Sequence, residues 1–290
     1  MNSHSLAEPA RITSEWFLAD HANPREVERW LTGLGVRDSE RAASELADLT
    51  HRAGPGALPL VARIVAQLDL VLPRCADPAM ALANLERYLT GVPRIDSTLE
   101  KLAEHPRTTE ILLQVFSTSQ YLSEVLFRDP QLLDWLEARP EGRDRDDLCA
   151  ELWNTISVVE SDPDQRLALR RFRQRETLRI GYNDIVRGYP LELITQDLSG
   201  LAEACVEAAV RLARGRAAAR FGVPTTPSGQ EARFVVLGLG KLGGQELNYS
   251  SDIDLVFLYD EDGATSGPKI LSNAEFFARM GSEIVRLLED

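Results

Sequence analysis

The sequence predicts an α+β fold in which a large all-helical N-terminal body precedes a small, incomplete β/α unit. Residues 1–220 show repeated helix-start and helix-stop signals, whereas short β-branched runs appear only after that region. Residues 221–232 are rich in Pro, Gly and small polar side chains, as is typical of a connector. We therefore expect a helical region (1–220), a connector (221–232) and a partial β/α domain (233–290).

Helix boundaries in the first region are marked by aspartates that precede prolines. Asp129-Pro130 and Asp162-Pro163 each place an N-cap residue before a proline at the first helical position. A long segment that starts near Leu191 is rich in alanine and has apolar residues at helical spacing. No internal repeat of fixed period recurs, so we expect a succession of packed helices.

One of these helices is rich in arginine. Arg171, Arg175 and Arg179 recur every four residues and therefore share one helical face. We expect this face to be solvated and paired with nearby acids such as Glu176 and Asp184. The alternative is a contact with phosphate or a partner, because guanidinium groups bind phosphate in a bidentate manner.

The last region contains two candidate strands and one helix. RFVVLGLG (233–240) and DIDLVFLYD (252–260) are short apolar, β-branched runs, which predict buried strands. Ser272 and Glu275 form a capping box that begins the final helix. Because two strands alone make a marginal sheet, they must share the core of the helices or have further strands beyond residue 290.

The glycine motif at 238–243 fits G-x-G-x-x-G and raises the alternative of a dinucleotide-binding turn. A parallel crossover between strands needs about a dozen residues or more. Only seven residues, 245–251, separate the last glycine from the second apolar run, so the sequence argues against this alternative. A P-loop is excluded because Lys241 is followed by Leu242 rather than Ser or Thr.

Two aspartates at the head of the second strand suggest a metal site. Asp252 and Asp254 are separated by Ile253 and would project from the same face of a strand. Such close carboxylates repel each other, and a Mg²⁺ ion that also binds substrate phosphates relieves the repulsion. The simpler alternative for this pair is a role in a turn or an N-cap, which is the role we expect for Asp260.

The residues around the aspartates predict a phosphate site. Gly243 and Gly244 form a turn that lets backbone N–H groups approach phosphates closely. Lys241 is either a phosphate contact or a solvated loop residue. Ser251 completes the predicted phosphate contacts, as a turn hydroxyl rather than a nucleophile, because no His stands near it.

The segment GLGKLGGQELNYSSDIDLVFLYD (238–260) resembles the glutamine synthetase adenylyltransferase family, whose catalytic domains belong to the polymerase β-like nucleotidyltransferase superfamily. The segments LRRFRQRETLRIGYNDI, DLSGLAEACVEAAV and SQYLSEVLFRDPQLLDWL agree, so the resemblance runs from about Leu85 to the end of the chain. It implies that Asp252 and Asp254 are catalytic and bind Mg²⁺, and that Gly243 and Gly244 form the family's glycine turn.

The resemblance also implies an activity and partners. Family members carry two catalytic units, and the helical region here resembles the lead-in to the unit that removes AMP from a tyrosine of glutamine synthetase by phosphorolysis, giving ADP. Glutamine synthetase, ATP or ADP, inorganic phosphate and the PII signal protein are the implied partners. The family's third carboxylate lies in a V-D-L-R-L-R-P-like segment after the last helix, which is absent here, so we expect an N-terminal fragment.

Composition limits the remaining alternatives. The net charge of −13 argues against a nucleic-acid substrate, and hence against a polymerase or tRNA-end enzyme. No signal peptide or membrane span is expected, and widely spaced Cys75, Cys149 and Cys205 favour inert thiols in the cytoplasm. The main alternative to an enzyme is an inactive module that docks on glutamine synthetase or the PII protein.

Overall fold

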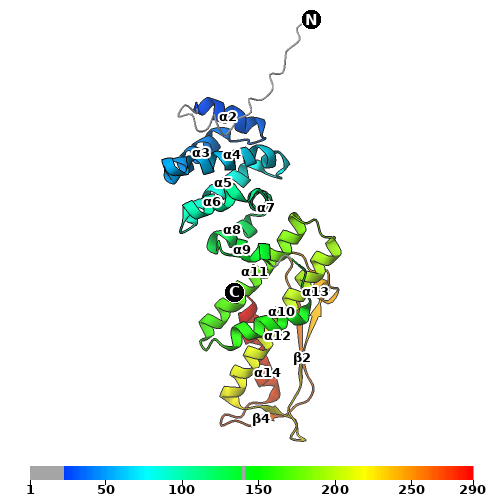
Figure 1. The fold of residues 1–290 in the computed structure, drawn as a ribbon. Helices are drawn as coiled ribbons and strands as arrows, with labels where there is room; N and C mark the ends of the chain where they lie inside the picture. The colour runs from blue at the N-terminus through cyan, green and yellow to red at the C-terminus, as the bar shows by residue number, and fades with distance from the viewer. Residues whose placement is uncertain (1–22, 139–140, 290) are drawn as a thin grey trace. The chain divides into compact units, whose positions relative to one another are not determined.

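The computed structural model describes residues 23–138 and 141–289 (Figure 1). Helices dominate the described part and its sheets are two-stranded, which confirms the predicted helix-rich α+β class. The chain divides into two compact units, one of residues 1–140 with 185–188 and one of residues 141–184 with 189–290. Helices and strands therefore share the second unit, which contains the candidate site.

The first unit is built from short helices that bury their apolar faces against one another. Leu31, Leu72, Leu99, Leu112 and Phe116 are completely buried in it. In chain order its elements are α2 (Pro24–Gly33), α3 (Ser39–Ala53), η1 (Pro55–Ala57), α4 (Leu58–Val71), η2 (Leu72–Arg74), α5 (Pro78–Gly91), α6 (Ile95–Glu104), α7 (Pro106–Thr118), α8 (Gln120–Arg128) and α9 (Leu132–Ala138).

The second unit places three helices before its strands. Its elements are α10 (Arg145–Ser157), α11 (Asp162–Ile185), α12 (Leu191–Phe221), β1 (Pro224–Thr225), β2 (Phe234–Leu239), α13 (Gly240–Gly243), β3 (Asp254–Tyr259), β4 (Ala264–Thr265) and α14 (Asn273–Leu288). The predicted start of α12 near Leu191 is confirmed. The capping box of α14 is also confirmed. The Ser272 side chain accepts a hydrogen bond from the Glu275 N–H, and the Glu275 side chain accepts one from the Ser272 N–H.

The two Asp-Pro sequences predict the starts of their helices less accurately. Asp129 caps the end of α8 and accepts a bond from the Gln131 N–H, and α9 begins at Leu132 rather than at Pro130. At α11 the Asp164 N–H donates to the Ser161 hydroxyl, so the cap lies one residue before Asp162. Both errors are local shifts, because several capping residues stand side by side in these segments.

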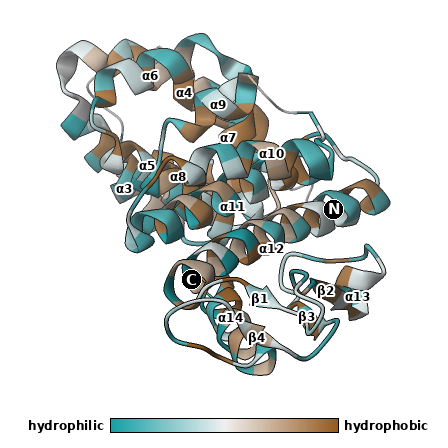
Figure 2. Cartoon of the chain, turned by 90° about the horizontal axis from the view of Figure 1, so that it is seen from below, coloured by the Kyte–Doolittle hydropathy of each residue, from teal (hydrophilic) through white to brown (hydrophobic). Residues whose placement is uncertain are grey.

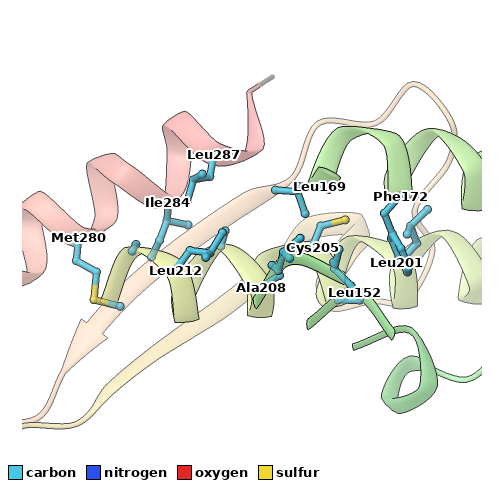
Figure 3. Close-up of a cluster of buried hydrophobic side chains, with 14 of the residues drawn as sticks. Leu152, Leu169, Phe172, Leu201, Cys205, Ala208, Leu212, Met280, Ile284 and Leu287 are labelled. Atoms are coloured by element: carbon cyan, nitrogen blue, oxygen red, sulfur yellow. The ribbon is translucent and has the colours of Figure 1, made fainter. Parts of the chain in front are cut away.

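The core of the second unit lies where α12 and α14 pack together. Figure 2 shows the two helices next to each other with apolar residues on both. In Figure 3, Leu212 of α12 faces Ile284 and Leu287 of α14, and all three are almost completely buried. The strands are thus held against a helical core, which answers the expectation that a two-stranded sheet needs support from the helices.

The predicted connector carries more structure than its composition indicates. β1 pairs antiparallel with β4, which lies between Asp260 and the last helix. Each of these strands has two residues, so neither is long enough to show an alternating pattern. Gly263 permits the pairing, because an added Cβ there would lie 1.9 Å from the Thr225 carbonyl oxygen.

The arginine-rich face of α11 was predicted to be solvated, and this is wrong for its C-terminal end. The face runs from an exposed Arg171 through a partly buried Arg175 to a completely buried Arg179. Its predicted pairing with Glu176 is confirmed, since Arg179 Nε donates to Glu176 Oε2 at 2.8 Å. Asp184 is not a partner of these arginines but accepts a hydrogen bond from Tyr249.

Glu176 is the centre of a buried ion network. Its Oε1 accepts from Arg143 Nη1 at 3.2 Å and from Arg175 Nη2 at 2.8 Å, while its Oε2 accepts from Arg179. Arg179 Nη1 also donates to Asp197 Oδ2 at 3.0 Å. Because buried charges are costly unless paired, this network fixes the positions of α11 and α12 relative to each other.

Candidate active site

Strands β2 and β3 form an antiparallel pair that places the glycine segment beside the aspartates. Phe234 pairs with Tyr259 at one end, and Leu239 pairs with Asp254 at the other. α13 follows β2 directly, so the turn begins next to the first residue of β3. The antiparallel order confirms that no parallel crossover joins the strands, which rules out the dinucleotide-binding alternative.

One face of the β2–β3 pair packs on α14. The Phe234 and Phe257 rings stack with centroids 5.8 Å apart, and Phe234 lies 5.2 Å from the Phe277 ring of α14. The helix approaches closely at Gly281, where an added Cβ would lie 3.2 Å from the Phe257 ring. This packing holds the strand that carries Asp254 against the helical core.

The opposite face of the pair is apolar and exposed within the described part of the chain. The continuous apolar runs of the sequence predict strands that are covered on both faces. For this face the prediction is wrong. The two aspartates lie on the exposed side, since Ile253 between them packs toward the core. The five apolar side chains, each exposed by 36–49%, are Val235, Leu237, Leu239, Val256 and Leu258.

Asp252 and Asp254 are both exposed, and Ile253, which stands between them in the chain, is partly buried. The paired strand begins at Asp254, so Asp252 belongs to the loop that leads into it rather than to the strand itself. Among the described residues, neither carboxylate makes a hydrogen bond or an ion pair. These two negative groups are therefore available to a ligand.

The carboxylate oxygens of Asp252 and Asp254 are of the kind that Mg²⁺ binds. Gly240 has φ of +56°, and an added Cβ there would lie 3.3 Å from Asp254 Oδ2, so the glycine leaves space beside that carboxylate. In residues 23–138 and 141–289, no group of three or more His, Cys, Asp or Glu side chains is arranged to hold a metal. Two carboxylates are nevertheless enough for Mg²⁺, which completes its shell with waters and substrate phosphates.

The glycine turn is closely packed at one residue and open at the next. An added Cβ at Gly243 would lie 2.6 Å from the Gly238 carbonyl oxygen of β2. At Gly244 the nearest atom would be the Gly240 oxygen at 3.6 Å, which is ordinary contact, and the backbone has a negative φ of −84°. Gly243 is therefore required by backbone packing, whereas Gly244 is not.

Gly243→Ala should therefore destabilise the protein by about 1–3 kcal/mol, because the new methyl group forces two backbone segments apart. Gly244→Ala is the matched control and should be neutral or slightly stabilising, since alanine restricts the unfolded chain more than glycine does. Urea unfolding of both variants measures the difference. Equal costs for the two substitutions would contradict this account of the turn.

The structure brings Lys241 and Ser251 together across the turn. Lys241 Nζ donates to Ser251 Oγ at 3.3 Å, and that hydroxyl donates to Asn248 Oδ1 at 2.6 Å. The Ser251 N–H also donates to the Asn248 carbonyl oxygen, which makes this serine part of a turn. The two predicted phosphate contacts are thus next to each other, Lys241 on α13 and Ser251 on the loop that precedes Asp252.

Asp260 has the structural role that the sequence predicted for it. Its carboxylate accepts from the Arg233 N–H at 2.9 Å and from Arg233 Nε at 3.0 Å, at the end of β3 away from Asp254. The hydrogen bonds from Arg233 hold the pKa of Asp260 below its usual value. Asp260 therefore closes the strand pair and takes no part in the candidate site.

The sequence did not reveal how the loop before Asp252 is held. Tyr249 Oη donates to Asp184 Oδ2 of α11 at 3.1 Å, and the Leu247 N–H donates to the buried Ser199 Oγ of α12 at 3.2 Å. These partners are 65 and 48 residues apart in the chain. No local spacing pattern could have identified them.

The three cysteines have the properties of inert thiols. Burial raises the pKa of Cys75 and of Cys149, and raises that of Cys205 to about 12, which makes these thiols poor nucleophiles. None of the three forms a disulfide.

Over the part of the chain that the structure describes, no helix combines the length and the apolar character needed to cross a membrane.

Comparison with known proteins identifies the family. Residues 109–290 match the family model described as glutamate-ammonia ligase adenylyltransferase. The chain belongs to this family. The resemblance that the 238–260 segment suggested is thereby confirmed, and it extends over more than half of the chain.

Two curated members of the adenylyltransferase family show how much of a relative the chain represents. A bifunctional glutamine synthetase adenylyltransferase/adenylyl-removing enzyme of Thioalkalivibrio sulfidiphilus is 33% identical over 96% of this chain and 30% of its own length. The enzyme of the same name from Pseudomonas syringae pv. tomato is 33% identical over 90% of this chain and 28% of its own length. The chain thus spans less than a third of these relatives.

Proposed function

We propose that this chain contains a nucleotidyl-transfer site that removes AMP from an adenylylated tyrosine of glutamine synthetase by phosphorolysis. The observation that carries the proposal is the pair of exposed carboxylates of Asp252 and Asp254 beside a glycine turn, neither of which has a partner within residues 23–138 and 141–289. The names of the relatives support the protein substrate, since both are glutamine synthetase adenylyltransferase/adenylyl-removing enzymes.

In this proposal Asp252 and Asp254 would hold Mg²⁺, which would neutralise charge on the phosphates of the nucleotide. The glycines at 243 and 244 would let the backbone approach those phosphates. Lys241 and Ser251, which already contact each other, would add a positive charge and a hydroxyl donor at the same edge. The contribution of the chain is therefore to position the phosphates and to balance their charge.

The proposed reaction balances as an in-line displacement at phosphorus. An oxygen of inorganic phosphate forms a bond to the AMP phosphorus, and the bond from that phosphorus to the tyrosine oxygen breaks. The products are ADP and tyrosinate, which takes up a proton from solvent. The exposed location of the carboxylates leaves room for a protein-bound substrate to reach them.

The direction of the reaction is a separate part of the proposal. The relatives carry both activities in their names. We assign the deadenylylating direction to this chain, because the sequence of its helical region resembles the lead-in to that unit. We place the reaction in the cytoplasm, which suits an acidic chain with three unpaired cysteines. ATP and the PII signal protein complete the set of proposed partners.

An assay of both directions tests the proposal. The chain is incubated with adenylylated glutamine synthetase, inorganic phosphate and Mg²⁺, and the release of ADP is measured. A parallel reaction contains unmodified glutamine synthetase and ATP, and the release of pyrophosphate is measured. We expect ADP in the first reaction and little pyrophosphate in the second. The opposite pattern would assign adenylylation instead, and binding of glutamine synthetase without either product would favour the inactive docking module.

A further inference from the structure

Residues 245–253 form a loop, here called the carboxylate loop, that joins α13 to β3 and contains Asp252. None of its residues belongs to a helix or a strand, so its course depends on turn hydrogen bonds and on contacts with the neighbouring helices. A site built on a loop is less well defined than one built on a strand unless the loop is tied down. The position of Asp252 relative to Asp254 is therefore set by whatever holds this loop.

The first half of the carboxylate loop is anchored on α12. Gln245 Nε2 donates to Glu203 Oε1 at 2.6 Å, and the Leu247 N–H donates to Ser199 Oγ. The Leu247 side chain is 6% exposed and belongs to the hydrophobic core of the second unit. Both anchors precede Asp252 by at least five residues, so they fix the start of the loop rather than the carboxylate.

The second half is tied by side-chain bonds to two helices, to α11 through Tyr249 and to α13 through Ser251. The Tyr249 phenol donates to Asp184 Oδ2 at 3.1 Å, three residues before Asp252. Partial burial and the nearby Asp184 and Asp197 carboxylates raise the pKa of Tyr249 well above its usual value, so the phenol keeps the proton that it donates. Beyond Tyr249, the side chain that contacts the core before β3 is that of Ile253.

We propose that Tyr249 and Asp184 are positioning residues, whose hydrogen bond holds the carboxylate loop so that Asp252 and Asp254 act on one divalent cation. The inference rests on the proposed function, because it gives the pair a shared metal. Groups that orient metal ligands typically contribute 10- to 100-fold to metal affinity. Loss of the Tyr249 hydroxyl should therefore weaken the binding of the cation rather than unfold the chain.

The test uses Mn²⁺ as the probe, with free Mn²⁺ measured by electron paramagnetic resonance in titrations of the 290-residue chain. Tyr249→Phe should weaken Mn²⁺ binding by about 10-fold and speed hydrogen exchange of the amides at 250–253. Tyr259→Phe is the matched control, because Tyr259 also donates to an aspartate, Asp262, at 2.9 Å, but at the far end of β3. It should leave both measurements unchanged.

Substitutions at the acceptor separate the hydrogen bond from the negative charge. Asp184→Asn keeps an oxygen that accepts from Tyr249 and should bind Mn²⁺ within a few-fold of the wild type. Asp184→Ala removes the acceptor and should match Tyr249→Phe. Wild-type Mn²⁺ binding in Tyr249→Phe overturns the inference even if the loop exchanges faster. Absence of saturable Mn²⁺ binding in the wild type would instead overturn the proposed function, so the two failures are distinct.

Discussion

Replacing both Asp252 and Asp254 by Asn should lower the rate of phosphorolysis by at least about two orders of magnitude. Removal of one preorganised electrostatic group from an active site commonly costs 10²–10³ in kcat, and here both predicted metal ligands are lost. The amide of asparagine has nearly the same shape as the carboxylate but carries no charge. The loss would therefore report on charge and metal binding rather than on packing.

The fold should tolerate this double substitution. Both side chains are exposed and unpartnered within the described ranges, and two nearby like charges repel each other. The midpoint of thermal unfolding should thus stay the same or rise. Asp262→Asn is a suitable control, since Asp262 is an exposed aspartate beyond the other end of β3 and should keep full activity. Equal turnover by the double variant and the wild type would remove both residues from the mechanism.

The parts of the fold that the sequence predicted correctly depend on local signals. The capping box at Ser272 acts over three residues, and α12 shows helical spacing along its whole length. The strands β2 and β3 were visible as apolar runs, and the short connection between them was enough to exclude a parallel crossover. β1 and β4 were missed because strands of two residues have no periodicity to detect.

The parts that the sequence could not predict depend on distant partners. The hydroxyl of Tyr249 reaches Asp184 across 65 positions, so a loop tyrosine gives no sign that it is tied to a helix. The apolar runs of β2 and β3 indicate two buried faces, yet one face is exposed in the described part of the chain. Burial depends on which other segments pack against a strand, and a single stretch of sequence does not contain that information.

The same reason explains the error at the arginine-rich helix. A spacing of four residues places Arg171, Arg175 and Arg179 on one face, but it does not say whether that face meets solvent or another helix. The structure surrounds the C-terminal end of the face with acceptors from other elements, including Asp197 and the Glu141 carbonyl oxygen. Arg175 and Arg179 are therefore structural groups of the second unit rather than a free phosphate-binding surface.

Glu176→Gln should destabilise the second unit by about 3–5 kcal/mol, the cost of breaking a buried ion pair by removing one partner. Glutamine has nearly the same volume, so no cavity contributes. It leaves Arg143, Arg175 and Arg179 without their shared carboxylate and turns an amide group toward cations. Arg179 Nη2 is already buried without a partner among the described residues, so the network has no spare acceptor.

Urea unfolding followed by circular dichroism measures this cost. Glu207→Gln is the control, because Glu207 pairs with Arg211 at 2.7 Å on the surface of the same unit, with the two side chains exposed by 37% and 47%. Exposed pairs of this kind contribute at most about 1 kcal/mol, so the control should lose little. A cost below about 1 kcal/mol for Glu176→Gln would show that the network is not a main support of the unit.

A double substitution distinguishes an unpaired charge from a general loss of packing. In Glu176→Gln the Arg179 guanidinium stays buried with one carboxylate partner fewer, whereas Glu176→Gln with Arg179→Met removes that charge as well. The double variant should therefore cost less than the sum of the two single variants, by about 0.5–3 kcal/mol for residues in direct contact. Additive costs would mean that the two side chains stabilise the unit independently. A positive coupling would show that α11 is held in place by the pairing of its charges. The same pairing would then also hold the end of α11 that carries Asp184, which anchors the carboxylate loop.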